Sequence, residues 1–273
     1  MTPVDLLARV IEHVPLARST YRIRLEAPAL AASIRPGQFV MLRLPSGDDP
    51  LLGRPFALYD TVLDATGQPF AVDIVYLVLG KMTARLAGVR VGDSLKIWGP
   101  LGNGFPAVQC DRVALVAGGI GQTPFLAHIR DLLGKRGYGG QPPVRQAERV
   151  SVFYGVRSSD YLAGVEDFVA AGAMVHLATD DGSRGRKGYV TDLLAEHEAP
   201  DHLFGCGPEP MLHALAAQAA SRGIACHVSL ETPMACGLGI CFSCVTKVKT
   251  ADGWDYRRVC VDGPIFDAAQ LVW

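Results

Sequence analysis

The sequence predicts a chain of three domains. The first is a small antiparallel β-barrel, the second a doubly wound parallel-sheet α/β domain, and the third a small cysteine-rich domain at the C-terminus. Short β-type runs between Pro and Gly turns come first, strands alternating with helices follow, and four closely spaced cysteines come last. We place the domains at residues 1–108, 109–225 and 226–273.

Composition narrows the class of protein. The chain has 273 residues, 49% of them hydrophobic, which suffices for more than one buried core. Its net charge of −1 offers no basic surface for nucleic acid. It has no apolar run of about 18 residues and no signal-peptide pattern at its start, so we expect no membrane span. Three further cysteines form an odd set, which favours a reduced, cytoplasmic protein: Cys110, Cys206 and Cys226.

The barrel is predicted from four short runs with alternating or β-branched residues. They lie at residues 21–25, 38–44, 72–79 and 94–98. Turn signals such as Pro36-Gly37 and Gly92-Asp93 separate them. Strands at this spacing are typical of a small antiparallel barrel.

The second domain is predicted from alternating strands and helices. Strands are expected at residues 113–117, 150–154, 174–178 and 202–206, and helices at 123–133, 164–171 and 209–221. The polar, Gly- and Pro-rich stretch 134–148 reads as an exposed loop. This alternation favours a parallel sheet with helices on both faces.

The third domain carries the most specific pattern in the chain. A C-x4-C-x2-C motif is followed, after fifteen residues, by a fourth cysteine, which is the plant-type ferredoxin spacing for a [2Fe–2S] cluster. Gly237 and Gly239 let the loop wrap closely around such a group. Residues 245–248 and 256–259 flank the turn 251–253 and predict a hairpin. The predicted ligands are Cys236, Cys241, Cys244 and Cys260.

A zinc site and a set of disulfides are the alternatives for these cysteines. Structural zinc sites favour two C-x2-C pairs or mixtures of Cys and His, whereas this chain has one such pair. Disulfides need an oxidising compartment. The spacing therefore favours the cluster.

Two motifs in the second domain point to a nucleotide. Residues 118–121 (GGIG) and Thr123 fall at a strand-to-helix turn, where glycine allows the backbone to approach a pyrophosphate. Cys206-Gly207-Pro208 ends a later strand at the same edge, where a small side chain leaves room for a nicotinamide ring. A tight turn without ligand and an ordinary buried cysteine are the alternatives. The predicted contacts are Gly118, Gly119, Gly121, Thr123, Cys206, Gly207 and Pro208.

The barrel carries a possible phosphate clamp. Arg54-Pro55 places a guanidinium group before an extended segment. The planar guanidinium of arginine can donate two hydrogen bonds to one phosphate. The segment Gly80-Lys81-Met82-Thr83 offers backbone N–H groups and a hydroxyl. Nicotinamide chemistry moves two electrons and a cluster accepts one, so a flavin is the expected converter between them. The order of the parts thus predicts a flavin-dependent NAD(P)H/iron–sulfur oxidoreductase.

Across nearly its whole length the chain resembles the electron-transfer subunit of NAD-dependent (class 1B) dihydroorotate dehydrogenase, a branch of the ferredoxin reductase superfamily. The segments that carry the resemblance are 36–39 (PGQF), 54–55 (RP), 99–105 (GPLGNGF), 118–124 (GGIGQTP), 179–183 (TDDGS), 188–193 (GYVTDL), 206–208 (CGP), Met211, 234–244 (MACGLGICFSC) and 258–266 (RVCVDGPIF).

The resemblance implies one FAD, one [2Fe–2S] cluster and NAD. It also implies a separate FMN-containing catalytic subunit, in a heterotetramer of two plus two, that oxidises dihydroorotate in pyrimidine biosynthesis. Electrons would pass from FMN to the cluster, to FAD and to NAD+. The positions aligned with FAD contacts are Arg54, Pro55, Phe56, Ala57, Val75, Tyr76, Leu77, Met82 and Thr83.

Three of these positions depart from the family pattern. Ala57 stands where Ser or Thr is typical, Leu77 replaces a common Arg, and Met82 replaces a common Gly. The first change removes a hydroxyl near the flavin. The second removes a phosphate contact, worth about 1–3 kcal/mol for a charge-assisted bond.

Two other functions remain open at this point. The chain could be a diaphorase subunit of a ferredoxin:NADP oxidoreductase or hydrogenase complex, which would differ in the partner that docks around Phe242, Ile265 and Phe266. It could also be a non-catalytic binding module with a decayed redox site. Arg157, after the strand 150–154, leaves the choice between NAD and NADP open. Asp180 and Asp181 are expected in a crevice loop, without a firm role. No role is expected for His176, His197 and His202.

Overall fold

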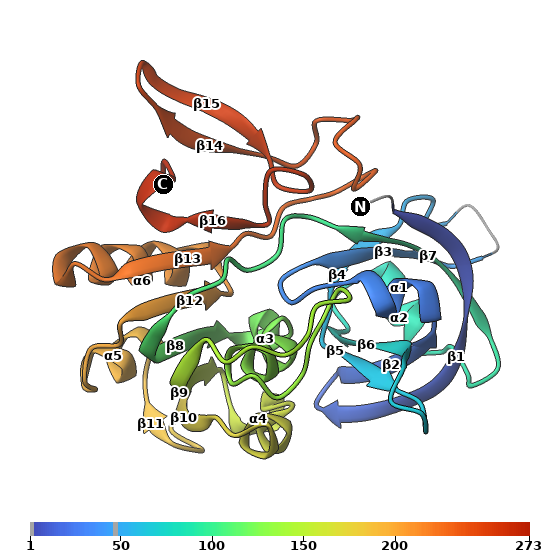
Figure 1. Cartoon of the computed structure of the whole chain (residues 1–273), viewed down its shortest axis with the longest axis horizontal. Coiled ribbons are helices and arrows are strands. Elements are labelled where there is room, and N and C mark those ends of the chain that lie inside the picture. Colours follow the sequence, from blue (N-terminus) through green and yellow to red (C-terminus); the bar gives the residue numbers. More distant parts are fainter. Residues whose placement is uncertain (1–2, 46–48) are drawn as a thin grey trace.

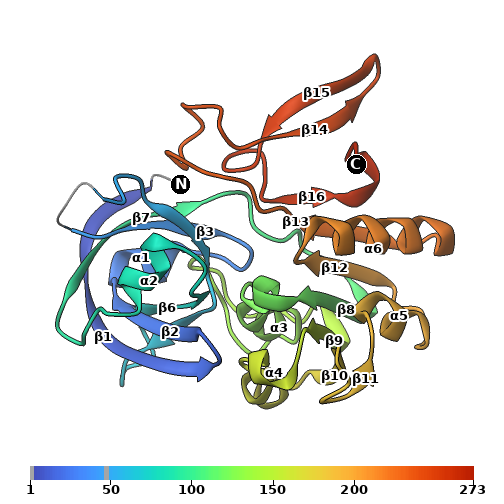
Figure 2. The same cartoon turned by 180° about the vertical axis from the view of Figure 1, so that it is seen from behind.

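The computed structural model describes residues 3–45 and 49–273. Figure 1 shows a barrel on one side, a parallel sheet with helices beside it, and a C-terminal segment that extends over both. Seen from behind, the barrel and the parallel sheet exchange sides, and the C-terminal segment again lies above them (Figure 2). Within the described residues, no helix is long and apolar enough to cross a membrane.

The first sheet is antiparallel throughout, as predicted, with the strand order β4-β3-β7-β1-β2-β6-β5. The four predicted strands are β2, β3, β6 and β7; β1, β4 and β5 were not predicted. Its interior is apolar, with Ile23 opposite Ile74 across β2 and β6 and both buried. Its elements are β1 (Val4–Ala17), β2 (Thr20–Glu26), α1 (Pro28–Ser33), β3 (Phe39–Arg43), β4 (Arg54–Ala57), β5 (Asp60–Leu63), β6 (Pro69–Leu77), α2 (Lys81–Leu86) and β7 (Ser94–Leu101).

The second sheet has the order β11-β10-β9-β8-β12-β13-β16, with every pair parallel except β13–β16. Helices α3 and α4 pack on one face and α5 and α6 on the other, which confirms the doubly wound prediction. The elements are β8 (Cys110–Gly118), η1 (Gly119–Gln122), α3 (Phe125–Leu132), β9 (Ala147–Val156), η2 (Ser159–Tyr161), α4 (Val165–Ala171), β10 (Met174–Thr179), β11 (Arg186–Lys187), α5 (Val190–Ala195), β12 (His202–Cys206), α6 (Glu209–Arg222), β13 (Ala225–Ser229), β16 (Ile265–Asp267) and η3 (Ala268–Gln270).

The C-terminal segment is joined closely to the second sheet. The predicted hairpin is present as β14 (Val245–Thr250) and β15 (Gly253–Arg258). However, β13 pairs in parallel with β12, and β16 returns from beyond the cysteines to pair with β13. The sheet thus extends past the boundary drawn after residue 225, and the division into domains stays a prediction.

The stretch 134–148, predicted as an exposed loop, is one only in part: residues 140–145 are exposed, whereas both ends of the stretch are packed. Its last two residues already belong to β9, and Tyr138 is buried. The Tyr138 hydroxyl donates to Asp60 Oδ1 at 2.6 Å, and Arg136 Nη1 donates to Asp60 Oδ2 at 3.1 Å. The Gly- and Pro-rich composition gives no sign of these contacts, which hold the first part of the stretch against the barrel.

Candidate functional site

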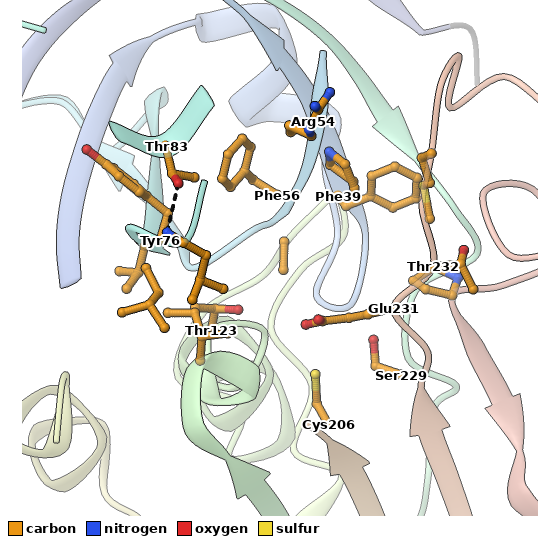
Figure 3. Close-up of a pocket in the computed structure, with 18 of the residues that line it drawn as sticks. Phe39, Arg54, Phe56, Tyr76, Thr83, Thr123, Cys206, Ser229, Glu231 and Thr232 are labelled. Carbon is orange, nitrogen blue, oxygen red and sulfur yellow. Dashed lines mark hydrogen bonds between the residues drawn. The ribbon is translucent and has the colours of Figure 1, made fainter. Parts of the chain in front are cut away.

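A cavity of about 590 Å³ lies where the three parts of the chain meet (Figure 3). This volume is in the range of sites for small molecules and cofactors. Its walls come from the barrel, from the carboxyl edge of the parallel sheet, and from the segment that leads to the cysteines. The lining residues are Gly37, Phe39, 54–57, 75–77, 79–83, Ile120, Thr123, Cys206, 229–234 and Pro264.

The barrel wall contains every residue that the resemblance aligned with FAD contacts. Strands β4 and β6 supply most of it, and the rings of Phe56 and Tyr76 meet edge-on with centroids 6.1 Å apart. The structure therefore brings these positions together around one space, although their contact with FAD stays a prediction. The nine residues are Arg54, Pro55, Phe56, Ala57, Val75, Tyr76, Leu77, Met82 and Thr83.

The Arg54 side chain lies at the exposed end of this wall (Figure 3). Its Nη1 donates to the carbonyl oxygens of Leu52 and Gly53, at 3.1 and 3.0 Å. A guanidinium has five N–H donors, so these bonds leave others that could meet a phosphate at the cavity mouth.

The turn before α2 is built by Thr83. Its Oγ1 accepts from the N–H groups of Leu79 and Gly80, at 3.0 and 3.1 Å. The hydroxyl expected to meet a phosphate is thus engaged in shaping this turn. Met82 borders the cavity but is buried in the barrel core together with Leu86, so the core accommodates the larger side chain.

The glycine-rich turn packs directly against the end of β12. A Cβ on Gly121 would lie 2.3 Å from the carbonyl oxygen of Cys206, and one on Gly118 would lie 2.7 Å from the sulfur of Met211. A Cβ on Gly207 would lie 2.9 Å from the backbone nitrogen of Gly118. Only glycine allows the two predicted nucleotide motifs to approach this closely.

The predicted nucleotide-site residues divide into two groups. Thr123 and Cys206 line the cavity. The others are not among the lining residues: Gly118, Gly121, Gly207 and Pro208 form the packed edge next to it, and Gly119 lies in the same turn with open space beside it.

Sequence reasoning missed the third wall of the cavity. Cys206 is buried, which raises the pKa of its thiol, and Ser229 hydrogen-bonds to it. The Glu231 carboxyl points toward the same space, and desolvation by the surrounding protein raises its pKa (Figure 3). Among the described residues that line the cavity, Glu231 is the only acidic one. The only feature of the sequence that hinted at a role for Glu231 was its position five residues before Cys236.

The loop predicted after β10 also lies at the carboxyl edge of the sheet. The Asp181 N–H donates to the carbonyl of Arg157, at 3.2 Å. Ser183 Oγ accepts from the N–H of Ser159 at 2.8 Å and donates to Asp181 Oδ1 at 2.6 Å, and these bonds lower the pKa of Asp181. The ends of β9 and β10 are thereby tied together, and both Arg157 and Asp181 lie at this edge.

The four predicted cluster cysteines converge. The sulfurs of Cys236 and Cys241 are 3.3 Å apart, and Cys244 and Cys260 form a second contacting pair. Cys244 and Cys260 are buried, whereas Cys241 is exposed. Among residues 3–45 and 49–273, no group of three or more metal-ligating side chains is arranged for a single metal ion. Two thiol pairs fit a two-iron cluster, in which each iron takes two cysteines.

Backbone N–H groups face these sulfurs. Leu238 N donates to the Cys236 sulfur at 3.3 Å, and Gly239 N donates to that of Cys260. Hydrogen bonds from Ser243 lower the pKa of Cys241 to about 6, while burial raises that of Cys260. Iron ligation deprotonates a thiol outright, and N–H donors stabilise the resulting thiolates.

The barrel domain contacts both the cysteine loop and the chain that follows Cys260. Asn103 Nδ2 donates to the carbonyl of Ile265 at 2.8 Å, and its Oδ1 accepts from the N–H of Ile265 at 3.2 Å. A Cβ on Gly237 would lie 2.8 Å from Met41 of β3. The cysteine loop and the chain after Cys260 are therefore held against the barrel end.

A barrel, a doubly wound nucleotide domain and a four-cysteine loop around one cavity define a ferredoxin reductase-like flavoprotein with an iron–sulfur domain. Comparison with known protein families gives a match for each of these three parts. Residues 8–105 match the oxidoreductase FAD-binding domain, residues 115–217 the oxidoreductase NAD-binding domain, and residues 231–272 the iron-sulfur cluster binding domain of dihydroorotate dehydrogenase B. The chain belongs to the family of electron transfer subunits of dihydroorotate dehydrogenase B (NAD(+)).

Three of the relatives with that name illustrate the similarity. The one from Geobacillus kaustophilus is 40% identical and the one from Bacillus caldolyticus 39%, each over 94% of both chains. The one from Shouchella clausii is 35% identical over 96% of both. A solved structure of an NADH-dependent reduced ferredoxin-NADP oxidoreductase superposes with a TM-score of 0.82 at 27% identity, covering 98% of this chain and 90% of that one. A ferredoxin reductase of carbazole 1,9a-dioxygenase, at 18% identity and a TM-score of 0.67 over 82% and 67% of the two chains, shares the fold.

Proposed function

We propose that this chain transfers electrons from a dihydroorotate dehydrogenase catalytic subunit to NAD+, through a [2Fe–2S] cluster and FAD. The cluster ligands are Cys236, Cys241, Cys244 and Cys260, and FAD occupies the cavity along the barrel wall. The partner carries FMN and oxidises dihydroorotate to orotate, in an assembly of two subunits of each kind. The chain works in the cytoplasm, in pyrimidine biosynthesis.

One observation carries this proposal most directly. The third wall of the cavity, residues 229–234, leads into the first cluster cysteine. Met234 lines the cavity and Cys236 is two residues further on, which is at most about 7 Å along an extended chain. A group in the cavity and a cluster on the cysteines would therefore be close neighbours, as electron transfer between them requires.

The residues around the cavity have distinct tasks. Bound there, FAD would exchange a hydride with nicotinamide and single electrons with the cluster. Phe56 and Tyr76 give the ring system an apolar wall. The thiol of Cys206, at the end of β12, stays neutral because burial raises its pKa. Glu231 supplies a carboxyl group that can accept a hydrogen bond from a carboxamide.

The docking face for the partner differs from the one that the sequence suggested. Phe242 is exposed as expected, but Ile265 and Phe266 are buried, because β16 adds to the edge of the second sheet. Large exposed apolar side chains instead gather around Cys241. They are Leu238, Ile240, Phe242 and Val261, which we call the cluster face. An apolar patch of this kind suits a protein interface, and it lies next to the exposed Cys241.

An anaerobic spectroscopic experiment tests the function. The catalytic subunit with this chain should reduce NAD+ with dihydroorotate, and Cys244→Ser should abolish that reaction while keeping electron transfer from NADH to a dye. Cys110→Ser is the matched control, since Cys110 lies at the far end of β8. Full dihydroorotate:NAD+ turnover in Cys244→Ser would contradict the proposed route.

A second candidate is a diaphorase subunit with another partner, such as a ferredoxin:NADP oxidoreductase or a hydrogenase. The superposition with the ferredoxin-NADP oxidoreductase structure favours it. Both candidates predict the same cofactors and differ in the protein bound at the cluster face. Co-purification from the native cell, followed by mass spectrometry of the bound chain, separates them. A non-catalytic module would be favoured by a purified protein that holds neither flavin nor iron.

A further inference from the structure

The Arg258 side chain contacts three separate parts of the cysteine region. It lies at the end of β15, two residues before Cys260. Its Nη1 donates to the carbonyl of Gly239 at 3.2 Å, and its guanidinium lies 5.4 Å from the centre of the Phe242 ring. Its Nε and its backbone N–H both donate to Asp262 Oδ2, at 3.3 and 2.7 Å. One side chain thus joins the loop of three cysteines to the turn that carries the fourth.

The loop needs such support because regular structure does not hold it. Residues 236–244 form bends and irregular backbone between β13 and β14. Phe242 has a φ of +55°, in the left-handed region that a bulky side chain rarely adopts. Its ring is exposed, and the guanidinium of Arg258 faces it. The contact with Arg258 offsets the unfavourable backbone and fixes the ring at the cluster face.

Gly239 is held from both sides. Its N–H donates to the Cys260 sulfur, and its carbonyl accepts from Arg258. A Cβ at this position would lie 2.6 Å from Val261 and 3.2 Å from Arg258 Nη1, so the loop and the turn are in direct contact. Loss of the arginine would leave the carbonyl of Gly239 without this donor, next to the N–H of the same residue that meets the Cys260 sulfur.

The charge of Arg258 also bears on electron transfer. Four thiolates, two sulfides and two ferric ions give a cluster a net charge of −2, and one added electron makes it −3. A permanent positive charge beside the loop favours the more negative state, and net charge is one of the terms that set a cluster's potential. Asp262, which is partly exposed beside Arg258, partly offsets that charge.

We propose that Arg258 is a positioning residue for the [2Fe–2S] cluster, which joins the cysteine loop to the Cys260 turn and whose charge raises the cluster potential. This inference rests on the cluster of the proposed function. Arg257 provides a matched control, because it is the next residue, carries the same charge and pairs with Asp255 instead of the loop.

The experiment compares Arg258→Gln, Arg258→Lys and Arg257→Gln in the full-length, iron-loaded chain. The two readouts are the midpoint potential from an EPR-monitored titration and the rate of iron loss to a chelator. We expect Arg258→Gln to shift the potential to more negative values and to lose iron several-fold faster. Arg258→Lys should have a midpoint potential close to that of the wild type, because the positive charge is kept. It should still lose iron faster, because lysine lacks the planar guanidinium group that donates several hydrogen bonds at once. Arg257→Gln should match the wild type in both readouts.

Equal potentials and equal rates of iron loss in Arg258→Gln and Arg257→Gln would overturn the proposal. If Arg258→Gln does not fold, a wild-type rate of iron loss in Arg258→Lys would overturn the positioning role by itself. A wild-type chain that holds no iron after anaerobic loading would overturn the proposed function as well, so the two failures are distinguishable.

Discussion

Trp98 Nε1 donates a hydrogen bond to the carbonyl oxygen of Cys236 at 3.0 Å, across 138 positions of sequence. Trp98 lies in β7 of the barrel, and Cys236 is the first predicted cluster ligand. The Trp98 ring also fills the space beside Gly53, where a Cβ would approach it to 2.6 Å. The flavin-side barrel and the cluster loop are therefore coupled by a direct polar contact.

Trp98→Phe should weaken this coupling without removing the aromatic packing. Loss of one hydrogen bond costs about 1 kcal/mol, so iron loss to a chelator should accelerate about fivefold. The flavin content should stay that of the wild type. Trp254→Phe is the control, because Trp254 is exposed on the hairpin. Equal rates of iron loss in the two variants would contradict the coupling.

Gly121→Ala should damage the nucleotide edge. The added Cβ would meet the Cys206 carbonyl at 2.3 Å, and overpacking of this kind costs about 1–3 kcal/mol. We expect a lower unfolding temperature and a higher KM for NADH. Gly88→Ala, whose nearest contact would be an ordinary 3.4 Å, should behave like the wild type in both measurements. A Gly121→Ala enzyme with unchanged KM and stability would mean that the two motifs are not tightly packed.

His128 should make the protein sensitive to acid. It is buried between Phe105 and Phe204, and burial lowers the pKa of its imidazole to about 3. Between pH 3 and about 6.5 the unfolded chain binds a proton at this residue and the folded chain does not, so stability falls as the pH falls. The loss should reach about 2 kcal/mol at pH 5 relative to pH 7.

Chemical denaturation of His128→Phe at both pH values checks this assignment. The variant should lose that part of the pH dependence, because phenylalanine keeps the ring stacking but does not titrate. His213→Gln, on the exposed side of α6, serves as the control and should retain the wild-type slope. An unchanged slope in His128→Phe would assign the acid sensitivity to other groups.

Ile240→Asp tests the cluster face. Ile240 is 78% exposed, so a charge there should leave the fold, the cluster and NADH-to-dye activity intact. A charge buried at an interface is costly, and we expect partner affinity to fall at least tenfold, or about 1.4 kcal/mol. Val169→Asp, exposed on α4, is the control. Calorimetric titration with the catalytic subunit would contradict the assignment if both variants bound equally well.

Much of the fold was predictable because its signals are local. Residues 202–206 were predicted as a strand with the observed ends, since the apolar run stops at a Gly-Pro turn. The spacing of the four cysteines alone indicated that they come together, as they do in the structure, and their role as cluster ligands stays a prediction. Strand β1 was missed because much of it is only partly buried, and a strand without a clear alternation resembles a loop.

The features that could not be predicted depend on contacts between segments that are distant in the sequence. Nothing in the composition of residues 229–234 indicates that Glu231 faces Cys206, because that proximity comes from the pairing of β12 with β13. The burial of Ile265 and Phe266 has the same origin, since β16 returns from beyond the cysteines to pair with β13. Local patterns do not specify which strand a returning segment will join.

The central claim is that one cavity connects nicotinamide chemistry to the cluster. An anaerobic NADH titration of the purified chain, followed by its visible spectrum, tests it most directly. We predict that NADH bleaches both the flavin bands and the iron–sulfur bands of the wild type, and only the flavin bands of Cys244→Ser. A wild-type spectrum with a cluster but without flavin, and without a response to NADH, would contradict the claim.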